Sequence, residues 1–425
     1  MSAPPRSAGP DHDALIGTLL RLVRSESTST RASLTERTGL GRTIVTQRVN
    51  ELIETGLLTE AGRGKSTGGR APREVRFRRE AACVIGVEVG ASGLEVALTD
   101  LAGCPLGFHE QPWDVTRGPE ATLDQVDSII GRLRAAHQPP AVPLVGIGVG
   151  LPGPVEFATG TPVAPPIMPG WDGYPVRDRL ASRHEVGVWV DNDVNVMALG
   201  ELRAGTASGV RDFLYVKVGT GIGAGLVSGG RLHRGTGGCA GDIGHITVAH
   251  GTSLPCRCGK RGCLEALAGG AALARDALAH AENGSSPYLA ALLGDQRPAL
   301  TASDVAAGAR SGDHTCVDLL RTAGERIGRT LAGLISFFNP SLVVIGGGVA
   351  LSGDLLLASV RQSVYALSLP LATRSLRVEM SALSSHAGMI GAAFTAIDEL
   401  LTPRQLTTWT HRLAPDSLPP AAATA

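Results

Sequence analysis

Four residues between positions 245 and 263 have the types and the spacing of a metal site. His245 is followed after ten residues by Cys256-x-Cys258, and after four more residues by Cys263. Three thiolates and one imidazole suit tetrahedral Zn²⁺, and four protein ligands leave no position for a catalytic water. We therefore expect a structural zinc ion that holds the surrounding segment in place. The alternative is a chance grouping of cysteines in a loop without a pocket.

A second polar motif, Asp191-Asn192-Asp193-Val194-Asn195, follows an apolar run at 187–190 and precedes a helical pattern. Ligands of open α/β sheets bind where the strands end, so these side chains would lie at the mouth of a ligand site. There Asp193 could accept hydrogen bonds from a polyol or, in an enzyme, act as a general base. The alternative makes Asp191 a helix cap and Asp193 a surface residue.

Two glycine-rich turns could bring backbone amides close to an anion. Residues 219–225 read Gly-Thr-Gly-Ile-Gly-Ala-Gly after a short apolar strand, and residues 346–348 are three glycines after another. The missing side chains permit close approach, although such turns are common and the signal alone is weak. The candidate phosphate- or nucleotide-binding residues are Gly219, Thr220, Gly221, Gly223 and Gly347.

The elements that position these motifs repeat one pattern, an apolar strand that runs into a glycine turn. The pattern recurs at 84–92, 144–154, 187–193, 216–225 and 342–348. Such units are typical of α/β sheets that bind ligands. Residues 94–98 alternate as the hairpin partner of the first strand, and a long helix is expected to end at Asn339-Pro340.

The first 80 residues follow a helical pattern instead. An apolar stripe predicts a helix over 12–25. Ser33 and Glu36 fit a capping box, which predicts a second helix starting at Ala32 or Ser33. After a glycine-containing turn, a third helix is predicted over 42–55, with Val45, Val49 and Leu52 on its buried face. Two short helices joined in this way form a helix-turn-helix.

The other face of the third helix carries side chains suited to base edges, with a merely solvated polar face as the alternative. These side chains are Arg42, Thr43, Gln47 and Asn50. Residues 60–77 then form a basic hairpin pattern with a glycine-rich tip, a wing that could reach phosphates or the minor groove. Its basic side chains are Arg63, Lys65, Arg70 and Arg73.

Length and charge agree with this division. The chain has 425 residues, which predicts two or more domains. Residues 1–80 hold 14 Lys and Arg against 9 Asp and Glu, whereas residues 81–425 hold 25 against 30. This segregation points to an N-terminal polyanion partner. Because no long apolar stretch or signal core is present, we expect a cytoplasmic protein without a membrane partner.

Together these motifs resemble the ROK family (repressor, open reading frame, kinase) over roughly residues 12–400. The resemblance rests on 38–42 with the 68–72 wing, 191–195, 219–225, 240–245 and the Cys-x-Cys-Gly-x-x-Gly-Cys-Leu-Glu run. It implies an α/β chain with an N-terminal winged helix-turn-helix before a two-lobed, actin- and hexokinase-like (ribonuclease H-like) fold. It also implies that a sugar pocket is lined by Asn192, Asp193, Asp242, His245 and Glu265, and that zinc is held by His245, Cys256, Cys258 and Cys263.

The resemblance also implies boundaries. We expect a flexible N-terminus at 1–11 and a winged helix-turn-helix domain at 12–80. A small lobe at 81–190 would be completed by a helix at about 385–402, and a large lobe at 191–384 would carry the zinc site. A loosely ordered tail is expected at 403–425.

Three departures separate the chain from the family's kinases, which also lack the winged helix. Glu88 replaces Asp in the first phosphate motif, Asp242 stands where Glu is common, and Ile167 stands where many have Asn. Phosphoryl transfer depends on positioning and electrostatics, so such changes are costly. We therefore expect a sugar-responsive repressor of carbohydrate genes that binds operator DNA as a homodimer or homotetramer. The alternative is a sugar kinase that uses ATP and Mg²⁺, with Asp193 as catalytic base.

Overall fold

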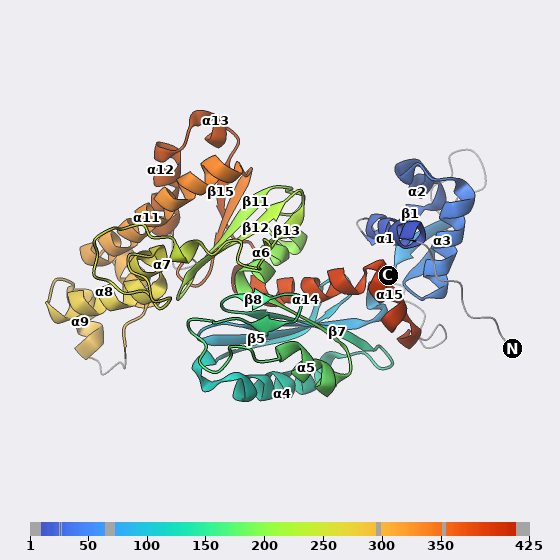
Figure 1. Cartoon of the computed structure of the whole chain (residues 1–425), viewed down its shortest axis with the longest axis horizontal. Helices are drawn as coiled ribbons and strands as arrows, with labels where there is room; N and C mark the ends of the chain where they lie inside the picture. The colour runs from blue at the N-terminus through green and yellow to red at the C-terminus, as the bar shows by residue number, and fades with distance from the viewer. Residues whose placement is uncertain are drawn as a thin grey trace.

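The computed structural model describes residues 10–24, 26, 28–63, 73–294, 299–350 and 354–413. A small N-terminal domain lies beside a body of two lobes, as Figure 1 shows. Each lobe is built on a five-stranded mixed sheet. Lys65 and Arg70, at the predicted tip of the wing, lie outside the described residues.

The N-terminal domain has the winged helix-turn-helix architecture, with three helices against a three-stranded sheet of order β1-β3-β2. Its elements are α1 (Pro10–Arg24), β1 (Ser29–Thr30), α2 (Arg31–Thr38), α3 (Arg42–Glu54), β2 (Leu58–Arg63) and β3 (Arg73–Phe77). Val45, Val49 and Leu52 of α3 are buried as predicted. They share one core with apolar side chains of α1 and of the sheet.

The predicted cap of α2 is wrong, because the capping residue lies three residues earlier than predicted. The capping box pairs Thr30 with Ser33: the Thr30 hydroxyl accepts from the Ser33 amide, and the Ser33 hydroxyl accepts from the Thr30 amide, both at 3.1 Å. Ser33 is therefore the third helical residue, and Glu36 is exposed. Threonine and serine at 30 and 33 suit a cap as well as serine and glutamate at 33 and 36, so local pattern alone does not decide between them.

The sheet of the first lobe has the order β10-β7-β4-β5-β6, in which β10, β7 and β4 are parallel and β4, β5 and β6 are antiparallel. The strands are β4 (Cys83–Val89), β5 (Gly93–Asp100), β6 (Pro105–Pro112), β7 (Leu144–Leu151) and β10 (Gly187–Asn192). The predicted first hairpin is confirmed. Helices α4 (Pro119–His137) and α5 (Val176–His184) cover one face, and α14 (Ala387–Leu400) covers the other. A short hairpin of β8 (Val155–Glu156) and β9 (Thr161–Pro162) follows β7.

The sheet of the second lobe has the order β13-β12-β11-β14-β15. Its strands are β11 (Phe213–Val218), β12 (Ile222–Ser228), β13 (Arg231–His233), β14 (Leu342–Gly346) and β15 (Arg377–Met380). One face packs against α6 (Asp193–Ala204), and the other against α11 (His314–Phe338) and α12 (Asp354–Leu367). The remaining helices are α7 (Leu264–Ala268), α8 (Gly270–Glu282), α9 (Pro287–Gly294), α10 (Ala302–Arg310) and α13 (Pro370–Thr373). Asn339, in a left-handed conformation, ends α11 where predicted.

Helices α6 and α14 cross between the two sheets with their backbones in contact. A Cβ atom on Gly391 would lie 1.6 Å from the carbonyl oxygen of Val196, and one on Gly200 would lie 2.4 Å from that of Ala387. No side chain fits at either position without moving a helix. Because α14 packs on the first sheet and α6 on the second, this crossing joins the lobes.

The expectation of a loosely ordered tail is wrong for residues 403–413. This segment forms α15 (Pro403–Trp409) and a following turn, and α15 packs against α1 of the N-terminal domain. Trp409 is 3% exposed, and its indole nitrogen donates to the carbonyl oxygen of Leu400 at 2.9 Å. The segment is rich in polar residues, but its few apolar side chains belong to the same core as those of the N-terminal domain.

The described part of the chain holds no helix with the length and apolar character needed to cross a bilayer.

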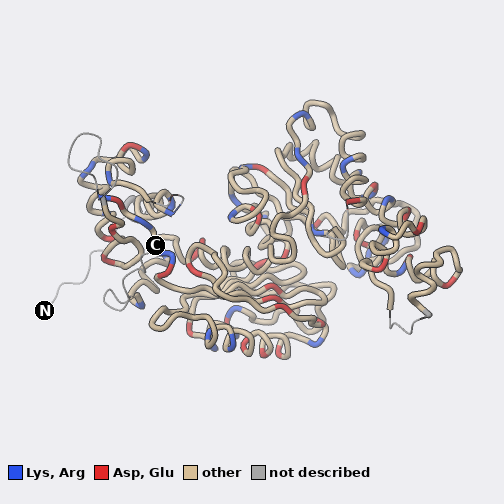
Figure 2. Tube along the Cα trace, turned by 180° about the vertical axis from the view of Figure 1, so that it is seen from behind, with Lys and Arg blue, Asp and Glu red and all other residues tan. Residues whose placement is uncertain are grey.

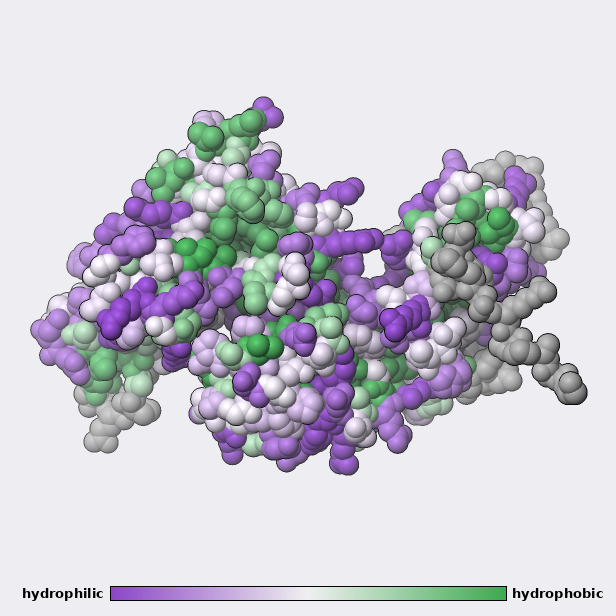
Figure 3. All heavy atoms as spheres, viewed as in Figure 1, coloured by the Kyte–Doolittle hydropathy of each residue, from purple (hydrophilic) through white to green (hydrophobic). Residues whose placement is uncertain are grey.

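Exposed apolar side chains gather at the outer end of the second lobe, around α13 (Figure 3). They are Leu367, Leu369 and Leu371. A surface patch of this kind is typical of a protein contact.

Replacing Trp409 by Ala should loosen the N-terminal domain from the body. Removing a buried tryptophan costs about 3–5 kcal/mol, so the midpoint of thermal unfolding should fall and the chain should become sensitive to limited proteolysis near residue 80. Leu371→Ala, at a side chain that is 77% exposed, is the control and should change stability by about 0.5 kcal/mol or less. Equal behaviour of the two variants would contradict the packing role of α15.

Candidate functional site

Asp193 begins α6 directly after β10, at the end of the first sheet. Asn192 caps the helix, since its Oδ1 accepts from the amides of Val194 and Asn195 at 2.9 and 3.3 Å. The Asn192 Nδ2 donates to Asp193 Oδ1 at 3.0 Å, and this oxygen also accepts from the Val194 amide. Asp193 is only 5% exposed, so its interpretation as a surface residue is wrong, and the helix cap is Asn192 rather than Asp191.

Asp191 is a structural anchor, and its carboxylate has other partners than Asp193. Its Oδ1 accepts from Asn195 Nδ2 at 2.9 Å, and its Oδ2 accepts from Arg234 Nε at 2.7 Å. The guanidinium of Arg234 lies 3.8 Å from the centre of the Phe157 ring. A buried carboxylate paired in this way fixes the start of α6.

Lys217, on β11 of the second lobe, places its ammonium against Asp193. Its Nζ lies 2.7 Å from Asp193 Oδ2 and 3.7 Å from Glu88 Oε1. Burial lowers the pKa of Lys217, but the two carboxylates outweigh burial and raise it above the ordinary lysine value. Sequence reasoning missed Lys217. The signal was present, because a lysine stands inside an apolar strand that enters a glycine turn.

Glu88 approaches the same ammonium from β4 of the first lobe. Burial raises the pKa of Glu88 to about 7, an effect that Lys217 opposes and Asp193 reinforces. Its Oε2 points at the first turn of α14, where a Cβ atom on Gly388 would lie only 1.4 Å away. The extra methylene of glutamate thus reaches a helix N-terminus, which favours a carboxylate.

Glu95 lies directly opposite Glu88 on β5. Burial, together with the charges of Glu88 and Glu110, raises the pKa of Glu95 to about 8. The face of β4 and β5 that carries Glu88 and Glu95 is therefore rich in carboxylate, and Lys217 is the cation that contacts it.

The turn after β11 is shorter than the sequence pattern predicts. Gly219, Thr220 and Gly221 connect β11 to β12, and the Gly219 amide donates to the Gly221 carbonyl oxygen at 2.9 Å. Gly223 belongs to β12, where a Cβ atom would meet the Val194 side chain at 2.9 Å, so packing on α6 accounts for this glycine. Gly347, at a φ of +91°, lies against the end of β11. The two glycine turns are therefore neighbours.

Glu265 and Asp242 flank this turn from the segment that carries the cysteines. Glu265 of α7 accepts from the Ile222 amide at 3.1 Å, and its carboxylate fills the space above Gly221. The half-exposed Asp242 carboxylate lies 3.9 Å from His245 Nε2. The structure therefore joins Glu265 to the glycine turn, Asp242 to His245, Asn192 to Asp193, and Asp193 to Lys217.

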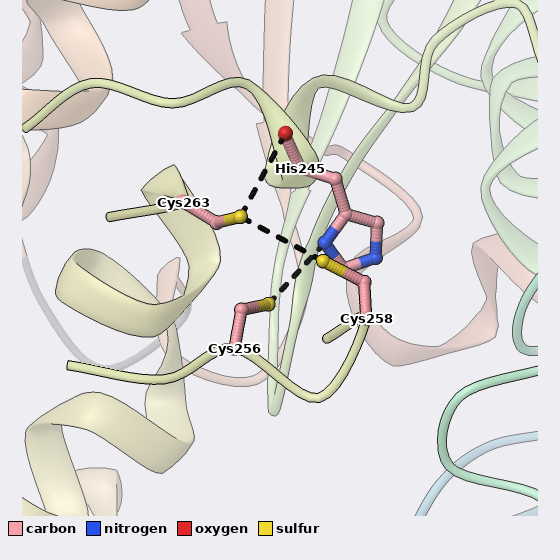
Figure 4. Close-up of side chains that lie close together, drawn as sticks. All are labelled: His245, Cys256, Cys258 and Cys263. Carbon is pink, nitrogen blue, oxygen red and sulfur yellow. Dashed lines mark hydrogen bonds between the residues drawn. The ribbon is translucent and has the colours of Figure 1, made fainter. Parts of the chain in front are cut away.

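His245, Cys256, Cys258 and Cys263 form the cluster predicted from their spacing. One ligand atom from each lies within 4.8 Å of all the others. Figure 4 shows the three sulfurs turned toward the imidazole, with Cys256 Sγ 3.5 Å from His245 Nδ1 and Cys258 Sγ 3.7 Å from Cys263 Sγ. A tetrahedral metal with bonds of about 2.3 Å to sulfur has sulfur–sulfur edges of about 3.8 Å. The cluster is thus a possible Cys/His metal site.

The candidate nucleic-acid interface is the exposed face of α3. Arg42, Thr43, Gln47 and Asn50 are all exposed, as predicted. Arg31, which sequence reasoning missed, donates to Asn50 Oδ1 at 2.9 Å. Figure 2 shows acidic and basic residues interspersed on this domain.

Charge pairs continue from this face to the wing. Arg73 is 62% exposed and pairs with Glu60 at 2.6 Å, and Arg31 approaches the same carboxylate at 3.4 Å. The backbone of Arg63 ends β2, so the described part of the wing places Arg63 and Arg73 on paired strands. The two ends of the wing therefore lie beside α2 and α3.

Two mixed sheets joined by crossing helices, with a buried carboxylate that pairs with a lysine of the second lobe, define a two-lobed protein of the actin and hexokinase type that carries a winged helix-turn-helix head. The model of the ROK family matches residues 84–399, and the chain belongs to this family.

Relatives of two kinds match the chain. A glucokinase of Halalkalibacterium halodurans is 34% identical over 73% of this chain and 93% of its own length. A xylose repressor of Caldicellulosiruptor bescii is 28% identical over 90% of this chain and 95% of its own. A crystal structure of a ROK family transcriptional regulator, a homologue of the E. coli MLC protein, covers 94% of this chain and 99% of its own at 24% identity, with a TM-score of 0.79. The glucokinase match leaves out about a quarter of this chain, whereas the other two leave out a tenth or less.

Proposed function

We propose that this protein is a transcriptional repressor of carbohydrate genes whose binding to operator DNA is modulated by a sugar in the cleft. The observation that carries the proposal is the joining of a winged helix-turn-helix head to a ROK body in one chain. Similarity to a xylose repressor over 90% of the chain supports it.

On the DNA side, α3 is the recognition helix. Arg42, Thr43, Gln47 and Asn50 read base edges in the major groove, and the basic residues of the wing, Arg63, Lys65, Arg70 and Arg73, hold phosphates or the minor groove. The chain acts as a homodimer or homotetramer, because two heads are needed to read paired half-sites one helical turn or a multiple apart. The apolar patch around α13 is a surface that a second copy could cover.

On the sugar side, Asn192, Asp193, Asp242, His245 and Glu265 line the pocket. Asp193 serves as a hydroxyl acceptor without being a catalyst, since a carboxylate at the edge of a sheet binds polyols by hydrogen bonds alone. The Cys/His cluster holds a structural zinc ion, which fixes the segment between Asp242 and Glu265 beside the glycine turn.

The path between the two sites runs through the crossing helices. Asp398 on α14 accepts from Arg24 of α1 at 3.1 Å and from Arg203 of α6 at 2.6 Å. One carboxylate therefore contacts the head and both helices at the lobe crossing. A sugar that binds best at one angle between the lobes changes how the head packs on the body. A coupling free energy of about 1–3 kcal/mol between sugar binding and DNA binding is enough to control operator affinity.

A second candidate function is an ATP- and Mg²⁺-dependent sugar kinase with Asp193 as base. The match to a glucokinase over the body of the chain favours it. The buried position of Asp193 at the cleft is compatible with both functions.

Gln47→Ala should weaken binding to the protein's own operator by roughly ten-fold or more at fixed salt, because a base contact is worth about 1–3 kcal/mol. Titration of labelled operator DNA measures this. Gln362→Ala, an exposed glutamine on α12, is the matched control and should bind as the wild type does. Unchanged operator affinity in Gln47→Ala would contradict the proposal that α3 reads the bases.

Asp193→Asn should bind the operator normally and lose the response to sugar. A screen of hexoses, pentoses and amino sugars for thermal stabilisation first finds the effector, since a ligand of the native state raises the melting temperature. That sugar should then change operator affinity in the wild type but not in Asp193→Asn. Release of ADP that requires Asp193 would support the kinase instead, and absence of any sugar effect would refute the inducer role.

Purified protein should contain about one zinc ion per chain, because four ligand groups form one tetrahedral site. Cys258→Ser should reduce the zinc content and weaken sugar binding together, as measured by elemental analysis and thermal stabilisation. Cys104→Ser, at an exposed cysteine outside the cluster, is the control. Zinc-free protein that still binds its sugar would contradict the structural role of the metal.

A further inference from the structure

The lysine between Asp193 and Glu88 is unusual within this chain. Only Lys65, Lys217 and Lys260 are lysines, among 39 basic residues. An ammonium is a compact charge with three donors, whereas the guanidinium used at nearly all other basic positions is wide and planar. Position 217 therefore carries the side chain that most resembles a small bound cation.

The ammonium bridges the two lobes. Lys217 stands on β11 of the second lobe, Glu88 on β4 of the first lobe, and Asp193 at the start of α6 between them. The contacts are 2.7 Å to Asp193 Oδ2 and 3.7 Å to Glu88 Oε1. The side chain of Lys217 is 18% exposed, so its charge is largely shielded from water and its interactions with the carboxylates are strong.

Glu88 supplies an independent sign that this group was built around a cation. Glu88 is 6% exposed, and its Oε1 lies 3.7 Å from the ammonium, whereas its Oε2, at the first turn of α14, has no hydrogen-bond partner within the described residues. Two buried carboxylates that face each other need a positive charge between them, because a buried anion without a partner is costly. A hard divalent cation would use the same carboxylate oxygens, and Lys217 already takes the nearest one on each side.

The hydrogen bonds of Asp193 also show that Lys217 is built into this group as its cation. Its Oδ1 accepts from Asn192 and from the Val194 amide, and its Oδ2 accepts from Lys217. A carboxylate has about four acceptor positions, so one remains for a hydroxyl of a bound polyol. Such a carboxylate is a fixed acceptor of hydrogen bonds.

We infer that Lys217 is the specificity-determining residue of the cleft, an internal cation that replaces a divalent metal ion, so that the cleft binds an unmodified neutral sugar without Mg²⁺ and nucleotide. This inference rests on the proposed sugar-binding function and names the chemical class of its ligand. It assigns Lys217 a positioning role, in which the ammonium holds Asp193 and Glu88 for the sugar.

The test compares the zinc-loaded wild type with Lys217→Met, using the sugar found in the thermal screen. In the wild type, Mg²⁺ with a non-hydrolysable ATP analogue should leave the sugar-induced shift in melting temperature unchanged, and Mn²⁺ alone should not bind by calorimetry. In Lys217→Met, sugar affinity should fall about ten-fold or more, because a charge-assisted contact is lost. Mn²⁺ should now bind with one additional site and restore part of the sugar affinity.

Two further variants separate charge from folding. Arg211→Met removes an exposed positive charge just before β11 and should behave as the wild type does. Should Lys217→Met fail to fold, the double variant Glu88→Gln with Lys217→Met keeps the net charge of the group, and it should fold and bind no additional Mn²⁺.

The results of these experiments test the inference and the proposed function separately. Wild-type sugar binding that requires Mg²⁺, or Lys217→Met that retains sugar affinity and binds no Mn²⁺, overturns the inference while leaving the sugar-responsive repressor intact. An additional Mn²⁺ site in the double variant likewise overturns it. Failure of every sugar to bind the wild type overturns the proposed function itself.

Discussion

The backbone contact between α6 and α14 is the constraint on which the rest of the structure depends. Gly391 and Gly200 let the two helices touch without side chains between them. Each helix belongs to a different sheet, so the contact sets how the lobes face each other, and Asp193 lies at the start of one of these helices. The same α14 continues into α15, which supports the head. One packing contact therefore sets how the two lobes face each other and is linked through α15 to the head proposed to bind DNA.

Charge is arranged around this crossing in two ways. Inside the cleft, Lys217 balances carboxylates that come from both lobes, and burial makes each of these interactions stronger than a surface pair. Near the head, Asp398 links Arg24 and Arg203 at the partly exposed end of α14. In the proposed function, the first group responds to a bound sugar, whereas the second lies where the head meets the body. In that proposal, a ligand that alters the group around Lys217 acts on the ion pairs of Asp398 through α6 and α14.

Local features of the fold were predictable from the sequence, and long-range ones were not. The Cys/His cluster follows from spacing within nineteen residues, and the buried face of α3 follows from helical periodicity. The cap of α2 was wrong because two overlapping residue pairs fit the same pattern. Trp409 and the partners of Lys217 were missed for a different reason, although a lysine inside an apolar strand was a signal for Lys217 itself. Their roles arise where segments distant in sequence pack together, and neither periodicity nor composition records that contact.

The position of α15 has a consequence for biosynthesis. The head precedes the body in the chain, whereas the segment on which it sits, residues 403–413, follows the body. During translation the N-terminal domain therefore emerges before the helix against which it packs has been made. Docking of the head on the body must therefore wait until residues 403–413 have also been made, and a chain cut short before them would lack the helix against which α1 packs.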